Sequence, residues 1–293
     1  MNLLAFDIGG THLKYGIVTD TGEVIDARLA DTEGAAGGAA LLAKVVALAA
    51  PMVAQYAPAG IAVSSLGLIE PHTGAVLGAA EAVPGYAGLS VQAALESAYG
   101  LPVTVENDVN CVALAEGWLG AAKGVAHFLA IAVGTGIGGG IVIDGRLYRG
   151  HRAAAGEWGY MKIAGKLWED HASMRGLVNS VTAQTGVAGW DGRKIFAACD
   201  EGDAQLQAVV AEWLELLATG IANLIYAFNP ERVVIGGGIA GRGEPFRSEL
   251  DAAINRVLLP DFQQQSQIVL ASAGNHAGMM GAARNWFLTK RFF

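Results

Sequence analysis

Short apolar runs broken by glycine turns fill the first thirty residues of the chain. Their lengths, and the turn residues between them, are typical of strands. Three runs fit: Leu3–Phe6, Leu13–Val18 and Glu23–Leu29. The long, alanine-rich stretch at 37–56 predicts a buried helix instead. Beyond it we expect a strand at 60–65, a helix at 89–99 and a strand at 102–106.

The opening pattern recurs in the second half. After a helix expected at about 108–119, the apolar run Phe128–Val133 leads into a glycine turn at 134–140, a strand at 141–143 and a tight turn at 145–146. Strands that alternate with helices imply mostly parallel sheets, and the repetition implies two similar halves. The later expected elements are helices at about 175–186, 192–199, 204–228, 244–258 and 276–288, and strands at 232–235 and 267–270.

Composition narrows the class of protein and of ligand. The 293 residues are 53% hydrophobic and 16% charged, with 41 glycines and a formal charge of −8. A chain of this length can hold two moderate cores, so we expect two lobes. Nucleic acid is a poor partner for an acidic chain, because phosphate contacts need clustered Lys and Arg. A small anionic ligand would be held by backbone N–H groups, a helix N-terminus or a metal.

The cysteines and the chain start favour the cytoplasm. Cys111 and Cys199 give neither a disulfide framework nor a metal-ligand spacing. The opening strand pattern leaves no room for a signal peptide, so export is not expected. We expect no membrane span either, because the apolar stretch at 37–53 is mostly alanine and contains Lys44 and Pro51.

Three glycine-rich segments each follow an apolar run. They are Asp7-Ile8-Gly9-Gly10-Thr11, Gly134-Thr135-Gly136-Ile137-Gly138-Gly139-Gly140 and Gly236-Gly237-Gly238. In the first, glycines let N–H groups approach a phosphate, Thr11 offers a hydroxyl and Asp7 can hold Mg²⁺ directly or through water. Ordinary turns are the alternative for the first and third segments. The second has more glycine than a hairpin needs, which indicates a ligand, and no helix follows it as in a Rossmann fingerprint or P-loop.

The order of these segments resembles the ROK family (repressors, open reading frames and kinases) of the hexokinase–actin superfamily, over nearly the whole chain. Two further segments carry the resemblance: Val105-Glu106-Asn107-Asp108 and Ala155-Gly156-Glu157-Trp158-Gly159-Tyr160. It implies an α/β fold of two actin-like (ribonuclease H-like) lobes with a nucleotide and sugar cleft between them. The lobes would be residues 1–108 with 276–293, and residues 109–275.

The resemblance also implies a reaction and its partners. The protein would transfer a phosphoryl group from ATP, with Mg²⁺, to a hydroxyl of a hexose or hexose derivative. The 6-hydroxyl is the preferred candidate. The partners would be a small sugar and a second copy of the chain in a homodimer, with no nucleic acid and no membrane.

Asp108 would take the proton of the attacking hydroxyl, and Asn107 would hold a neighbouring one. Phosphoryl transfer independently asks for a carboxylate beside the nucleophile, although a plain helix cap is the alternative for this pair. By the resemblance the sugar would contact Asn107, Glu157, Tyr160, Glu169 and Gly67. The nucleotide would contact Asp7, Gly9, Gly10, Thr11, Lys14, Gly134, Thr135, Gly136, Gly236, Gly237 and Gly238. A solvated surface Glu is the alternative for Glu157.

The chain departs from the family at its zinc site. Tyr160 stands where zinc-containing members carry a His, and the downstream cysteines are missing. A structural zinc needs about four N or S ligands, so we predict no zinc, with His151 and His171 as ordinary side chains. ROK kinases that act on the 6-hydroxyl of β-glucosides resemble this Tyr-for-His pattern. Glucose and N-acylhexosamines stay open as substrates.

A second departure concerns phosphate binding. His12 stands where a Lys often occurs in the first phosphate segment, and Lys14 could replace it. Which of the two contacts phosphate stays open.

Three other functions compete with a kinase. A sugar-sensing repressor is disfavoured, because family repressors carry a helix-turn-helix domain before the first phosphate segment and this one begins at Asp7. A non-catalytic sugar-binding protein would not need Asp7 and Asp108. An actin-like ATPase would leave Glu157 and the Asn107-Asp108 pair without a task. A sugar kinase is the hypothesis that uses all of these residues.

Overall fold

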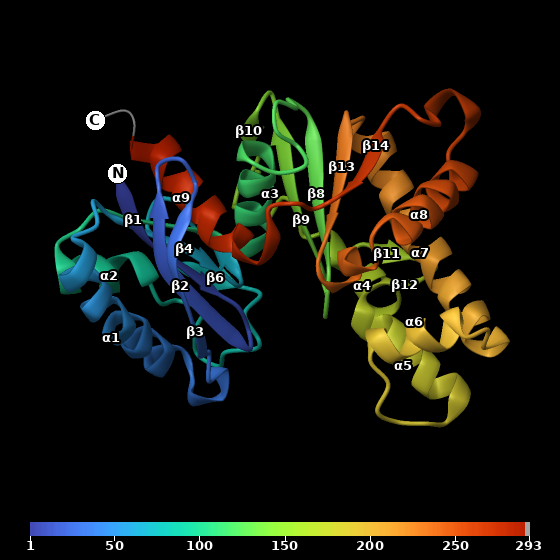
Figure 1. Cartoon of the computed structure of the whole chain (residues 1–293), viewed down its shortest axis with the longest axis horizontal. Helices are drawn as coiled ribbons and strands as arrows, with labels where there is room; N and C mark the ends of the chain where they lie inside the picture. The colour runs from blue at the N-terminus through green and yellow to red at the C-terminus, as the bar shows by residue number, and fades with distance from the viewer. Residues whose placement is uncertain (291–293) are drawn as a thin grey trace. The chain divides into compact units, whose positions relative to one another are not determined.

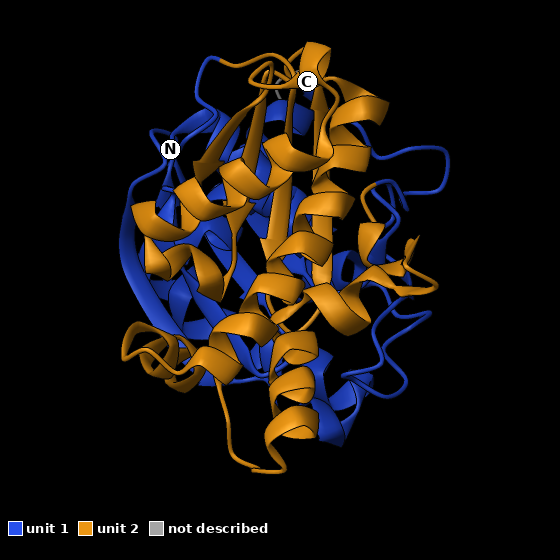
Figure 2. Cartoon of the chain, turned by 90° about the vertical axis from the view of Figure 1, so that its right-hand side faces the viewer, with its two compact units in different colours: residues 1–124, 146–155, 272–293 blue, residues 125–145, 156–271 orange. Residues whose placement is uncertain are grey.

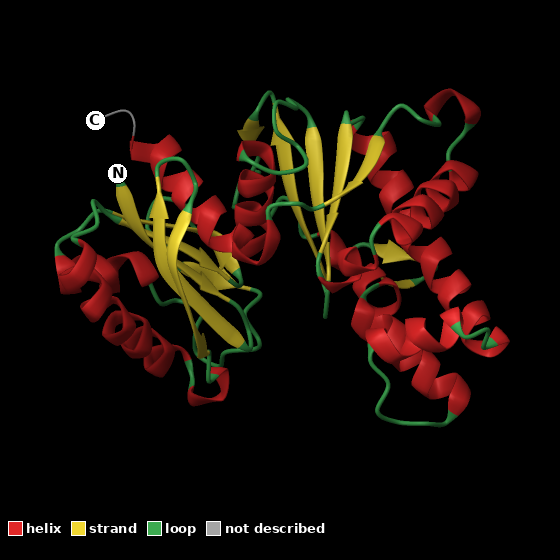
Figure 3. Ribbon diagram, viewed as in Figure 1, coloured by secondary structure: helices red, strands yellow, loops and turns green. Residues whose placement is uncertain are grey.

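The structure, a computed structural model, describes residues 1–290 and divides into two compact units (Figure 1; Figure 2). Unit 1 comprises residues 1–124, 146–155 and 272 onward, and unit 2 comprises residues 125–145 and 156–271. Each unit has its own mixed sheet with helices (Figure 3). The expected α/β class is therefore confirmed.

The sheet of unit 1 brings three strand ends to one edge. Its order is β3-β2-β1-β4-β7, with β1 antiparallel to β2 and parallel to β4, and β4 parallel to β7. In this register Asp7 lies opposite Ser64, and Ser64 lies opposite Glu106. The strands are β1 (Asn2–Ile8), β2 (His12–Thr19), β3 (Val24–Asp31), β4 (Ile61–Ser65) and β7 (Val103–Asn107), and β5 (Leu68–Ile69) pairs with β6 (Val76–Gly78) beside them.

Two cores cover the two faces of this sheet. Side chains alternate between faces along β1. Phe6 and its even-numbered neighbours pack with α1 (Gly38–Tyr56) and α2 (Val91–Tyr99). Ala5 and the odd-numbered Leu3 pack with α3 (Asp108–Trp118) and α9 (Ala277–Lys290).

The prediction that the helix at 37–56 is buried was wrong for most of its surface. Only one face of α1 is buried, at Leu41, Val45, Ala49 and Met52, because its alanines can face water at little cost. Both α1 and α7 (Ala204–Phe228) are long and apolar enough to cross a membrane, a test that core helices also pass. Each contributes buried side chains to the core of its own unit.

The compact units follow other bounds than the expected lobes. Helix α3 lies in unit 1 instead of the second lobe, because it packs closely on α9. A Cβ on Gly281 would lie 1.7 Å from the carbonyl oxygen of Cys111. Residues 291–293, the end of the expected lobe segment 276–293, lie outside the described residues.

The sheet of unit 2 is also mixed. Strand β13 runs parallel to β8 and β14, and β9 pairs antiparallel with β8. Its strands are β8 (Phe128–Val133), β9 (Ile137–Ile143), β13 (Arg232–Gly236) and β14 (Gln267–Leu270), with the short ladder β11 (Lys162–Ile163) and β12 (Lys166–Leu167). Its helices are α4 (Trp168–Ala172), α5 (Met174–Thr185), α6 (Gly192–Asp200), α7 and α8 (Glu244–Val257).

Strand β9 begins four residues earlier than the pattern predicted, at Ile137 instead of Ile141. Gly138, Gly139 and Gly140 pair with β8, so the turn itself is only Gly134–Gly136. A Cβ on Gly139 would lie 2.3 Å from the ring of Trp158. Packing of an aromatic ring, and not only a ligand, thus explains the excess of glycine. The following turn lies at Asp144 and Gly145, both with positive φ, and leads to β10 (Arg146–Leu147).

Candidate active site

Asp7 lies at the end of β1, against the first turn of α9. Its Oδ1 accepts a hydrogen bond from Ser64 Oγ at 2.8 Å, and Lys14 Nζ lies 3.7 Å from its Oδ2. A Cβ on Gly278 would come within 2.3 Å of the carboxylate. The side chain of Asp7 keeps 20% of its exposure.

The turn after β1 is held by its own backbone. Gly9 N–H donates to the His12 carbonyl at 3.0 Å, and Thr32 Oγ1 donates to the Gly9 carbonyl at 2.7 Å. Gly10 and Thr11 at its tip are exposed. Lys14 donates to the Asn275 carbonyl at 2.9 Å and so lies between the turn and the start of α9.

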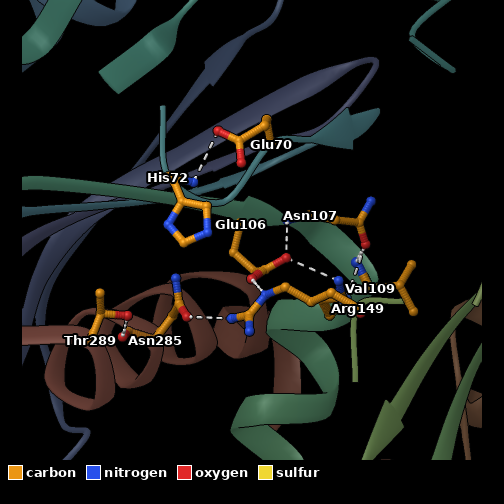
Figure 4. A network of polar contacts seen from close by, with 9 residues as sticks. Glu70, His72, Glu106, Asn107, Val109, Arg149, Asn285 and Thr289 are labelled. Atoms are coloured by element: carbon orange, nitrogen blue, oxygen red, sulfur yellow. Dashed lines mark hydrogen bonds and ion pairs between the residues drawn. The ribbon is translucent and has the colours of Figure 1, made fainter. Parts of the chain in front are cut away.

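Asn107 is the N-cap of α3 (Figure 4). Its Oδ1 accepts from the N–H groups of Val109 and Asn110, each at 3.0 Å. Its Nδ2 donates to the Gly67 carbonyl and to Asp108 Oδ1, both at 3.0 Å. Asp108 is the first residue of the helix, and its Oδ1 also accepts from Val109 N–H at 2.9 Å. Asn107 thus caps the helix and orients the Asp108 carboxylate, and Gly67 reaches the site through Asn107.

Glu106 is a buried carboxylate directly behind this pair. Its side chain is 2% exposed, and its Oε2 accepts from Arg149 Nε at 2.6 Å. Its Oε1 accepts from the backbone N–H of Asn107 at 3.0 Å and from Asn110 Nδ2 at 2.9 Å (Figure 4).

Burial raises the pKa of the neighbouring Cys111 thiol well above its ordinary value, and the negative charges of Glu106 and Asp7 add to the effect. Cys111 is therefore a neutral core side chain.

In unit 2, Glu169 joins two of the predicted segments. Its Oε2 accepts from Ile137 N–H at 3.4 Å, beside the turn that begins at Gly134. Cβ atoms on Gly136 and Gly159 would lie 2.5 and 2.8 Å from this oxygen. Arg175 Nη2 lies 3.3 Å from Glu169 Oε1. Thr135 is thus in the same small region as the segment that carries Glu157 and Tyr160.

Packing of Trp158 holds this segment on β9. Trp158 is 5% exposed and lies over Gly139, and a Cβ on Gly156 would lie 2.2 Å from the Gly139 carbonyl oxygen. Glu157 precedes a short 3₁₀ turn at 158–160, where Tyr160 is 49% exposed. The anchor is therefore Trp158, and Glu157 and Tyr160 flank it.

The third glycine segment ends β13, beside β8. Gly236 pairs with Ala132, and Gly237 has a φ of 87°. A Cβ on Gly237 would lie 2.3 Å from the Val133 carbonyl oxygen. Gly238 begins the 3₁₀ turn that precedes α8. The carboxyl ends of β8 and β13 are adjacent, so unit 2 brings together the segments at 134–136 and 236–238.

Metal ligands are sparse. Within residues 1–290 no group of three or more His, Cys, Asp or Glu side chains is placed to hold a metal ion. His151 is exposed in unit 1, and His171 belongs to α4 of unit 2. A single carboxylate such as Asp7 suits Mg²⁺ that is held mainly by phosphates and water.

Four residues that support this arrangement were not identified by the sequence analysis, among them Asn285, whose Oδ1 accepts from Arg149 Nη2 at 2.9 Å. Ser64, Glu106, Arg149 and Asn285 have no motif of their own, although Glu106 lies inside a quoted segment. The charge of Glu106 at the end of an apolar strand is the one signal that marks a buried ion pair. Its partner is 43 residues away, which no local pattern reveals.

Known proteins resemble the chain from end to end. The ROK family model matches residues 3–289. A protein named beta-glucoside kinase from Listeria monocytogenes is 37% identical over 292 residues, 96% of both chains. A ROK family protein from Streptococcus pneumoniae, solved with sucrose, has a TM-score of 0.89 and 30% identity, and covers 100% of both chains. A ROK family glucokinase from Streptomyces griseus, solved with glucose and AMPPNP, has a TM-score of 0.82 and 26% identity, over 97% of this chain and 98% of that one. The expected family and two-lobed fold are confirmed, and the chain belongs to the ROK family.

Proposed function

We propose that the chain is an ATP-dependent kinase that phosphorylates a hydroxyl, in first place the 6-hydroxyl, of a hexose or hexose derivative. The observation that carries the proposal is the Asp108 carboxylate at the start of α3, which Asn107 Nδ2 orients at 3.0 Å. A fixed carboxylate at this place can accept the hydroxyl proton while the hydroxyl oxygen attacks the γ-phosphorus of ATP and ADP leaves.

The other residues divide between sugar and nucleotide. Asn107, Glu157, Tyr160 and Glu169 offer the amide, carboxylate and phenol groups that bind sugar hydroxyls, and Gly67 supports Asn107. Asp7 would hold the Mg²⁺ of MgATP, and Lys14 would lie near the phosphates. Backbone N–H groups of Gly10 and Thr11, of Thr135 and Gly136, and of the turn Gly236–Gly238 would bind the phosphates and ribose. Gly9 and Gly134, whose N–H groups close their own turns, would let the nucleotide approach the backbone closely.

A β-glucoside is the favoured substrate. Tyr160 is half exposed, so its ring could stack on the second ring of a disaccharide. The beta-glucoside kinase of Listeria monocytogenes, 37% identical to the chain, supports the same choice. We place the enzyme in the cytoplasm, where ATP is available, as a homodimer.

A sugar panel tests this function. The purified chain is incubated with MgATP and cellobiose, glucose, N-acetylglucosamine, N-acetylmannosamine, allose or fructose, and ADP release is followed by a coupled assay. The matched control omits the sugar, which measures ATP hydrolysis alone. We expect sugar-dependent ADP release that is highest with cellobiose. Hydrolysis of ATP at the same rate with and without every sugar would contradict a kinase and favour an ATPase.

A further inference from the structure

Arg149 connects three elements of unit 1 through two buried partners. Its Nε donates to Glu106 Oε2 at 2.6 Å, and its Nη2 donates to Asn285 Oδ1 at 2.9 Å (Figure 4). Asn285 is on α9 and is 6% exposed. Glu106 is the penultimate residue of β7. One guanidinium thus spans the space between α9 and β7, a task for which its several fixed donors are suited.

Glu106 links Arg149 to the proposed catalytic pair, Asn107 and Asp108. Its other oxygen accepts from the backbone N–H of Asn107 at 3.0 Å and from the side chain of Asn110, one turn along α3, at 2.9 Å. The peptide between residues 106 and 107 and the first turn of α3 are therefore held by one carboxylate. Asp108 follows directly, so its direction depends on that turn.

Arg149 is also part of the segment 146–155, which is the one stretch of unit 1 between two stretches of unit 2. Ala155 N–H donates to the Arg149 carbonyl at 3.2 Å and closes this segment into a loop. Along the chain the loop continues into Gly156 and Glu157, the proposed sugar-binding segment. Within this loop, Arg149 contacts Glu106, which in turn holds the start of α3.

We propose that Arg149 is a positioning residue for phosphoryl transfer, which acts through Glu106 to hold Asn107 and Asp108 in their reactive orientation. The inference rests on the proposed kinase function. It assigns no contact between Arg149 and the substrate. The ion pair should affect both stability and turnover. A buried carboxylate without its partner destabilises the fold, whereas loss of the orientation of Asp108 lowers turnover.

Paired substitutions distinguish these effects. Arg149→Met leaves the Glu106 charge buried and unpaired, which should lower the denaturation midpoint strongly. Glu106→Gln with Arg149→Met removes both charges, so the midpoint should return toward that of the parent. Without Arg149, the Gln side chain at position 106 is no longer connected to Asn285 on α9. The kcat of the double variant should therefore stay about 10–100-fold below that of the parent, because small misplacements of reacting groups are costly. Arg149→Lys keeps the charge without the fixed fork, and its kcat should lie between those of the parent and Arg149→Met.

The measurements are kcat and both KM values with the best sugar, together with urea midpoints, at a temperature where every variant is folded. The KM for ATP should stay within about twofold of the parent, because the nucleotide segments are untouched. Arg28→Met is the matched control. It breaks an Arg–Asp pair of 2.9 Å in the same unit, on β3, and should leave kcat unchanged.

A double variant with both parental stability and parental kcat would overturn the inference and leave the kinase function standing. If Arg149→Met does not fold, the double variant alone decides. A parent that phosphorylates no sugar would overturn the proposed function and this inference with it. A parent whose activity requires Asp108 but tolerates the double substitution would overturn the inference alone.

Discussion

The side chain of Asn107 in unit 1 combines capping of a helix with orientation of the proposed base, Asp108. The Asn107 oxygen satisfies two N–H groups of the first turn of α3, and its nitrogen holds Asp108 and the Gly67 carbonyl. The sequence left open whether Asn107 or Asp108 would cap this helix. Asn107 is the cap, and its side chain also donates to the Asp108 carboxylate, the proposed base.

Asn107→Ala should therefore lower both stability and activity. Loss of an N-cap typically costs about 0.5–2 kcal/mol of unfolding free energy, and Asp108 would lose a donor that orients it. Urea titrations measure the first effect and kcat the second. Asn107→Ser keeps a cap acceptor without a second carboxylate beside Asp108, and serves as the control for stability. Equal stability of Asn107→Ala and the parent would show that the cap contributes nothing.

Cys111 should make stability depend on alkaline pH. Its pKa in the folded protein is raised by burial and by nearby carboxylates, whereas in the unfolded chain it is about 8.5. Below about pH 8.5 the thiol is protonated in both states. Above it, ionisation lowers the free energy of the unfolded chain only, so stability falls as pH rises. Cys111→Ala should flatten this fall between pH 7 and about 9.5, measured by urea titration at both values, and an identical slope in both proteins would refute the assignment.

At the scale of elements, glycines set how closely α9 approaches its neighbours. Gly278 lets its first turn lie against Asp7, and Gly281 lets it lie on the backbone of α3 at Cys111. Helix α9 therefore packs against both Asp7, the proposed metal-binding carboxylate, and α3, the helix that begins at the proposed base Asp108. The helix carries no strong amphipathic pattern that would announce this role.

Gly281→Ala should destabilise unit 1. The added Cβ would lie 1.7 Å from a backbone oxygen, so α9 or α3 must shift, and overpacking of this kind costs about 1–3 kcal/mol. Gly78→Ala is the control, since a Cβ there meets nothing within 4 Å. Differential scanning calorimetry should show a lower midpoint for Gly281→Ala only. Equal midpoints would mean that the helices adjust freely.

Long apolar runs were predictable as elements, and short ones were not. The runs that became β1, β2, β8 and β13 and the helix α7 stand out by length and hydropathy. The two-residue strands β5, β11 and β12 leave no period to detect. The predicted start of β9 was wrong because glycine is usually typical of a turn. Here Gly139 lies inside the strand and leaves space for the Trp158 ring.

At the scale of the whole molecule, the predicted site residues divide between the two units. Asp7, Asn107 and Asp108 belong to unit 1, and Glu157 and Glu169 belong to unit 2. Motifs in the sequence predicted these residues together with the family, because each motif is local. The supporting ion pair of Glu106 and Arg149 joins distant segments, so only the folded chain reveals it.

The zinc prediction concerns the whole chain as well. Protein purified without chelators should carry well below one zinc per chain by elemental analysis, because Tyr160 replaces the family's His and the cysteines are missing. Dialysis against a chelator should leave activity with added Mg²⁺ unchanged. Stoichiometric zinc would contradict the prediction, and its loss in His151→Ala or His171→Ala would identify the ligands.

Asp108→Asn tests the central claim most directly. The substitution keeps the size of the side chain, and the cap on Asn107 is untouched, so the urea midpoint should change little. Loss of a positioned general base should lower kcat by about 10²–10⁴-fold, while the KM values for sugar and ATP stay within a few-fold of the parent. Asp261→Asn, at an exposed residue of the 3₁₀ turn 260–262, is the matched control and should keep full activity. A folded Asp108→Asn enzyme whose kcat with the best sugar lies within about threefold of the parent, well below the loss expected for a general base, would contradict the assignment of Asp108 as the base.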